Sequence, residues 1–173
     1  MTSADEPGRQ APRFVRASTN LLVLTPIRLA LGLGGLAAAA TVGRVGPALL
    51  GFAVGTVGAT VALSADRRYS RSLLGEIPTL PPDARLASRA EMAASGVFPS
   101  TVAVALLTLP ALTVDATLAA VLAGVLAGMA VSGTIGLVGL YDLERRSGYA
   151  LYVRRPGGGV FQSPRELDAV TPA

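Results

Sequence analysis

The sequence predicts an all-α integral membrane protein whose four transmembrane helices form two pseudo-repeated helical hairpins. Its 173 residues are 51% hydrophobic and only 15% charged, and the mean hydropathy is +0.53. These values are too apolar for an ordinary soluble domain of this length. The apolar residues also gather in four blocks, and a stretch of the second block returns in the fourth. Composition, blocks and repeat together define the predicted fold class.

Each apolar block has the length that a helix needs to cross about 30 Å of hydrocarbon. The blocks cover approximately residues 20–42, 46–64, 97–114 and 116–141. Backbone polar groups need internal partners in lipid, so we expect helices. The predicted segments are a tail at 1–19, a first hairpin at 20–64, a loop at 65–96, a second hairpin at 97–141 and a tail at 142–173.

The repeated stretch ends both the second and the fourth block. Residues 55–68 read GTVGATVALSADRR, and residues 133–146, shifted by 78 positions, read GTIGLVGLYDLERR. Both carry Gly, Thr, a β-branched residue, Gly, an acid and two arginines in the same register. This echo predicts two related hairpins, each ending in a small-residue helix with a pair of arginines at its exit.

The arginines predict the topology. Three precede the first block, five lie in the long loop and five follow the last block, whereas the two tight turns between blocks hold only Arg44. The positive-inside rule then places both termini and the loop in the cytoplasm. With an even number of spans, the hairpins are related by an axis along the membrane normal.

Small residues predict how the second and fourth helices pack. They recur at every fourth position, which permits close backbone approach in lipid. The candidate helix-packing residues are Gly51, Gly55, Gly124, Gly128, Ser132 and Gly136. Two alternatives stay open, because such spacings arise by chance in a chain rich in Gly and Ala, and the stripes also suit an external partner helix.

Arg28 is the only charge within a block, and an intramembrane charge is a functional hypothesis by default. Two structural explanations compete with an ion- or substrate-binding role. The side chain can snorkel toward the cytoplasm, or the spanning helix can begin at Pro26 with Thr25 as its N-cap, which places Arg28 near the interface.

The polar segments contain few structural signals. We expect the N-terminal tail to be disordered, residues 83–94 to form a short helix after two prolines, and 156–159 to close a small hairpin in a partly ordered C-terminal tail. The arginines of the loop suit anionic lipid headgroups, although a solvated connector fits equally well.

The composition limits the possible chemistry. The chain contains no cysteine and no histidine, so thiol nucleophiles, disulfides and the usual ligands of zinc, copper and haem are excluded. We expect no metal or cofactor. The basic residues lie at block ends rather than on one face between aromatics, which argues against nucleic-acid binding. All of them are arginine, a coding bias typical of high-GC bacteria.

Three classes of function remain. We favour a noncatalytic accessory or assembly component of the cell membrane, in contact with anionic headgroups and with a second copy or another membrane protein. A subunit of an oligomeric transporter or channel is the alternative, with Arg28, Thr56, Ser132 and Thr134 along a path. An enzyme is disfavoured, because no carboxylate, histidine or cysteine lies in a block.

Overall fold

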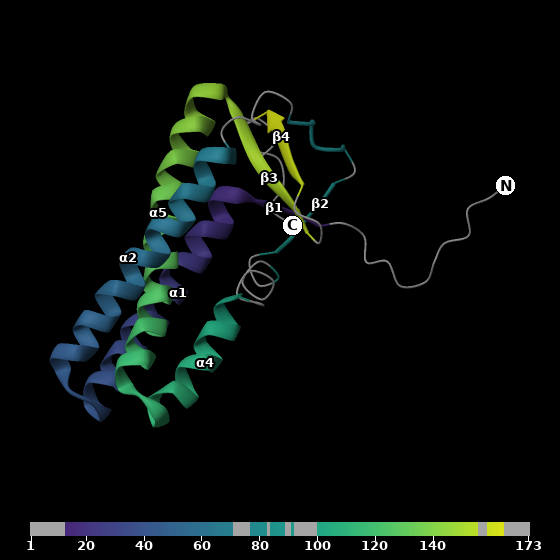
Figure 1. The fold of residues 1–173 in the computed structure, drawn as a ribbon. Helices are drawn as coiled ribbons and strands as arrows, with labels where there is room; N and C mark the ends of the chain where they lie inside the picture. Colours follow the sequence, from purple (N-terminus) through teal and green to yellow (C-terminus); the bar gives the residue numbers. More distant parts are fainter. Residues whose placement is uncertain are drawn as a thin grey trace.

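The computed structural model describes residues 13–70, 77–82, 84–88, 91, 100–155 and 159–164. In this part of the chain, long helices form a bundle and a four-stranded sheet lies beside one end of it (Figure 1). The helices are α1 (Ala17–Val42), α2 (Val45–Ser70), α4 (Ser100–Val114) and α5 (Ala116–Ser147). We call the end that carries the sheet the sheet end, and the opposite end, with Arg44 and Asp115, the turn end.

Three of the helices, α1, α2 and α5, are long and apolar enough to cross a membrane. Large apolar side chains cover their outer surfaces, for example Leu33, Leu50 and Val138, which are 51%, 68% and 65% exposed. The first, second and fourth predicted blocks are therefore helices of membrane-crossing length. Helix α4 is also apolar but has only 15 described residues, or about 22 Å.

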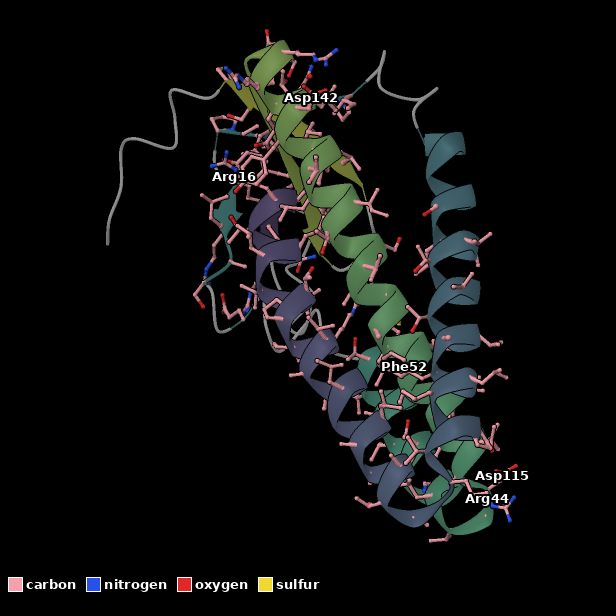
Figure 2. All side chains as sticks on the ribbon, turned by 90° about the vertical axis from the view of Figure 1, so that its left-hand side faces the viewer. Arg16, Arg44, Phe52, Asp115 and Asp142 are labelled. Atoms are coloured by element: carbon pink, nitrogen blue, oxygen red, sulfur yellow. The ribbon has the colours of Figure 1, made fainter. Side chains whose placement is uncertain are left out.

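Helix α5 is the centre of the bundle. It lies parallel to α2 and antiparallel to α1 and α4, and most of its buried residues are alanine and glycine. In Figure 2, α1 and α2 flank α5 on opposite sides.

Both ends of α5 are capped. The Asp115 carboxylate accepts a hydrogen bond from the Thr117 amide at 2.7 Å and caps the start of α5. Gly148 ends the helix at φ 74°, a left-handed conformation that favours glycine.

The two hairpins are not packed equivalently, which corrects the predicted pseudo-symmetry. Helix α1 packs along α5, but α2 and α4 make no comparable contact in the described structure. A symmetric repeat would place Gly133 opposite Gly55, whereas Gly55 lies against Val121 and Val125.

The tight turns explain this register. A Cβ on Gly43 would lie 2.6 Å from the Cβ of Ala116, and Arg44 and Asp115 lie close together at the turn end (Figure 2). Helices α2 and α5, the second helices of the two hairpins, therefore start at one level, and α5 continues further than α2 before it reaches its repeated motif. The repeated motif in α5 is therefore displaced along the bundle by roughly two helical turns relative to the motif in α2.

The sheet has the strand order β2-β1-β3-β4. Its strands are β1 (Arg13–Arg16), β2 (Arg85–Leu86), β3 (Tyr149–Arg155) and β4 (Val160–Pro164). Strand β1 leads directly into α1, pairs in parallel with β2 and pairs antiparallel with β3. Phe14 and Phe161 pack edge to face, with ring centroids 5.1 Å apart. The sheet thus links the strand before α1 and the two strands after α5 to the loop between the hairpins.

Several expectations for the polar segments need correction. Residues 13–16 form a strand instead of a disordered tail, because β1 pairs with β3. Helix α2 continues through Ser70, beyond the predicted loop start. Residues 85–86 form a strand inside the predicted helix at 83–94, of which Glu91 alone is helical among the described residues. The predicted C-terminal hairpin is present as β3 and β4. Residues 1–12, 71–76, 83, 89–90, 92–99, 156–158 and 165–173 lie outside the described residues.

Candidate functional site

Arg28 lies well inside a helix, not at its start. Helix α1 begins at Ala17 and runs through Pro26, so the alternative in which the helix starts at Pro26 is wrong. Arg28 lies eleven positions after Ala17, which is roughly 16 Å along the helix. The Nε of Arg28 donates a hydrogen bond of 2.9 Å to the hydroxyl of Thr101. Thr101 is fully buried in the first turn of α4, so Arg28 links α1 to α4.

Other polar groups lie on the same part of α1. The buried Asn20 Oδ1 and Thr25 Oγ1 have no hydrogen-bond partner among the described residues. A Cβ on Gly133 would lie 2.9 Å from that Thr25 hydroxyl, so α1 and α5 approach closely here. Because uncompensated polar atoms are costly in an apolar interior, this patch is the strongest candidate for a polar binding site inside the bundle.

Four of the six predicted packing residues lie at the contact of α2 with α5. A Cβ on Gly51 would lie 2.9 Å from the Thr117 carbonyl oxygen, and one on Gly128 would lie 2.5 Å from that of Thr56. A Cβ on Gly55 or Gly124 would overlap backbone atoms of the facing helix. These glycines therefore permit direct backbone contact between the helices.

The two remaining packing candidates differ from these four. Ser132 is buried and Gly136 is half-buried on α5. Gly133, next to Ser132, faces Thr25 of α1. The structure therefore brings together the first four small residues, and the later part of α5 approaches α1.

Two of the three hydroxyl groups proposed to line a path, those of Thr56 and Thr134, donate hydrogen bonds within their own helices. Thr56 donates to the Phe52 carbonyl at 2.8 Å, and Thr134 donates to the Ala130 carbonyl at 3.1 Å. Thr134 is exposed on the outside of α5. The structure thus does not gather Thr56 and Thr134 around Arg28.

The sheet end contains a buried carboxylate that the sequence did not single out. Glu144 of α5 has no exposed surface. Its carboxylate lies 3.1 Å from the Arg16 guanidinium of β1 and accepts a hydrogen bond of 3.2 Å from the Leu151 amide of β3. In the sequence, Glu144 is followed directly by Arg145 and Arg146. Its actual partner is 128 positions away, so only the fold reveals the pair.

A second carboxylate, Glu91, lies in the loop. It forms an ion pair of 2.7 Å with Arg13, and both side chains are about one-third exposed. The Ser88 amide donates to its other oxygen at 3.0 Å. The Ser88 hydrogen bond, followed by the nearby charges of Arg13 and Arg85, lowers the pKa of Glu91 below its ordinary value of 4.5.

The described residues contain no group of three His, Asp or Glu side chains that could hold a metal ion. The described structure is a helical bundle with three helices of membrane-crossing length and a small sheet at one end. No protein-family model matches the sequence, and no curated protein or solved structure is significantly similar to it.

Proposed function

We propose that the chain is a small noncatalytic integral membrane protein, an accessory or assembly component that packs through small-residue helix faces. One observation carries this proposal: polar side chains of the bundle serve as structural ties. Thr56, Thr108 and Thr134 bond to their own helices, Thr60 reaches the Gly128 carbonyl at 3.3 Å, and Arg28 bonds to α4.

In this proposal the protein lies in the cell membrane of a bacterium, with the sheet end in the cytoplasm. The distribution of arginines between the two ends of the bundle is the basis for this orientation. Arg13, Arg16, Arg85 and Arg154 lie in or beside the sheet, whereas Arg44 is the single arginine of the described turn end. The positive-inside rule favours the arginine-rich side as the cytoplasmic one.

The partner is a second copy or another membrane protein that contacts the outer face of α2. That helix is packed by α5 along one side, and Val54, Val57 and Val61 on its outer surface are 60%, 61% and 62% exposed. In lipid, such a face associates by side-chain packing rather than by a hydrophobic driving force.

Cross-linking in native membranes tests the proposal. A photoreactive residue at Val57 should yield one saturable adduct of defined mass, either a dimer or a complex with one membrane protein. The same residue at Leu33, on the outside of α1, is the matched control and should label lipid. Identical patterns at Val57 and Leu33 would contradict a specific partner on α2.

The alternative is a subunit of an oligomeric transporter or channel. The patch of Arg28, Asn20 and Thr25 favours it, because polar groups inside a membrane mark ion or substrate paths. The variant Arg28→Gln separates the two functions. The accessory role predicts a modest loss of stability, since one interhelical hydrogen bond in lipid is worth about 0.6–2 kcal/mol. Normal abundance with a complete loss of cellular function would favour the transporter.

A further inference from the structure

Three arginines occupy one cross-strand row of the sheet. Arg13 of β1 is the register partner of Arg85 in β2 and of Arg155 in β3. Neighbouring strands are about 4.8 Å apart, so the three residues lie side by side. We call them the arginine row. Like charges placed directly opposite each other destabilise a sheet, so this row requires compensating negative charge.

The described residues supply only part of that charge. The Glu91 carboxylate pairs with Arg13 at 2.7 Å, and its field also reaches Arg85. The Arg85 side chain is exposed. Among the described side chains of the row, one carboxylate against the guanidinium groups of Arg13 and Arg85 leaves a net positive charge, which suits an anion with several oxygens, such as a phosphate group.

The position of the arginine row along the bundle also suits contact with lipid headgroups. Strand β1 continues directly into α1, so Arg13 precedes the first helical residue, Ala17, by four positions. Strand β3 runs from the end of α5 back toward the start of α1, and its far end lies beside β1 (Figure 1). If α1 spans the membrane, the arginine row lies near the start of the span, where lipid phosphates are found.

We infer that the arginine row binds the phosphate of an anionic phospholipid headgroup and holds the sheet against the membrane surface. This inference deepens the proposed function, because it rests on the sheet end facing the cytoplasmic leaflet, and it names the ligand of that surface. Arginine suits the role because its planar guanidinium contacts phosphate oxygens in a bidentate manner.

A lipid titration tests this inference. Full-length protein in neutral detergent micelles is titrated with short-chain phosphatidylglycerol, and with phosphatidylcholine as the uncharged comparison. The double variant Arg13→Gln/Arg85→Gln should bind phosphatidylglycerol roughly 25-fold more weakly, since each arginine near an anionic surface contributes about fivefold. The control Arg44→Gln/Arg145→Gln removes the same charge away from the row and should bind like the wild type.

A second variant covers the case in which the double variant does not fold. Glu91→Gln removes the competing carboxylate and should bind phosphatidylglycerol more tightly than the wild type. Unchanged or weaker binding by Glu91→Gln would overturn the inference, as would wild-type affinity in a folded double variant.

Free phosphate is the remaining competitor. Displacement of phosphatidylglycerol by inorganic phosphate at matched ionic strength would identify a site for soluble anions and overturn the lipid assignment. Binding of phosphatidylglycerol that is unchanged by inorganic phosphate would support the lipid assignment. The titration needs no protein partner, so its failure is distinguishable from a failure of the cross-linking experiment.

Discussion

At the scale of single residues, the Glu144 carboxylate connects three parts of the fold. It lies in the last turns of α5 and contacts Arg16 immediately before α1 and the Leu151 backbone in β3. Glu144 is fully buried, whereas Arg16 keeps 26% of its side chain exposed. Removing one partner of a buried pair leaves the other charge uncompensated, which costs more than the pair itself contributes.

The first prediction follows from this geometry. Glu144→Gln should lower the free energy of unfolding by on the order of 3 kcal/mol and weaken hydrogen-exchange protection of the Leu151 amide. Asp142→Asn is the matched control, because Asp142 forms an exposed pair with Arg146 and should cost about 0.5 kcal/mol or less. Equal effects of the two substitutions in detergent unfolding would contradict the structural role of Glu144.

The second prediction concerns pH. Hydrogen bonding to Ser88 lowers the pKa of Glu91 in the fold below its ordinary value of 4.5. A lowered pKa contributes stability above the unfolded value, and this stability is lost as the pH falls from about 4.5 through the folded pKa. The protection factor of the Ser88 amide, which corrects for the intrinsic pH dependence of exchange, should therefore fall over that range. In Glu91→Gln the protection factor of the Ser88 amide should not change over the same range, and a wild-type profile of the protection factor in this variant would contradict the assignment.

At the scale of elements, glycines decide where helices touch. Gly55 and Gly58 are three positions apart on α2, yet a Cβ on Gly55 would overlap the Val121 carbonyl of α5, while one on Gly58 would meet nothing within 4 Å. A Cβ on Gly133 would meet the end of the Thr25 side chain at 2.9 Å. A side chain can move aside more easily than a backbone carbonyl. The three glycines therefore differ in their tolerance of bulk.

The third prediction uses this difference. Gly55→Ile should destabilise the bundle most, Gly133→Ile less, and Gly58→Ile least, because added bulk at Gly55 separates α2 from α5 and removes many van der Waals contacts. The measurement is thermal unfolding of the three variants in the same detergent. Equal losses of stability for Gly55→Ile and Gly133→Ile would instead support the equivalent hairpins expected from the repeat. Equal losses for all three variants would show that the glycines reflect the amino-acid composition of the chain and have no specific role in helix packing.

The elements predicted most successfully from the sequence are those that depend on local pattern. Long apolar runs predict α1, α2 and α5, and the glycines in 156–159 predict the hairpin of β3 and β4. Strand β1 has no such signal, since RFVR is short and its partners in β3 lie more than 130 positions away. The repeat at Gly55 and Gly133 gave the wrong helix register because the tight turns, not the repeated motif, align α2 with α5.

At the scale of the whole molecule, the candidate site was predictable only in part. The rarity of charge inside apolar blocks singles out Arg28, but its partner Thr101 belongs to another hairpin. The Glu144–Arg16 pair and the arginine row both depend on strand pairing between distant segments. Residue spacing along the chain does not reveal such contacts, so the long apolar helices were predictable from the sequence and the sheet that joins them was not.

For the molecule as a whole, we propose that the helices span a membrane, with the sheet end in the cytoplasm and the turn end outside. The chain contains no cysteine, so single cysteines can be introduced without background. Ser88 lies in the loop beside β2, and Arg44 and Asp115 lie at the turn end (Figure 2). All three positions are outside the apolar helix interiors.

Labelling of intact cells with an impermeant thiol reagent tests this claim most directly. The variants Arg44→Cys and Asp115→Cys should react from outside, while Ser88→Cys should react only after the cells are opened. The tight turns and the sheet would then lie on opposite sides, as the arginine distribution predicts. Reaction of Ser88→Cys in intact cells, with protection of Arg44→Cys and Asp115→Cys, would contradict the orientation, and equal reaction of all three would contradict the membrane-spanning arrangement itself.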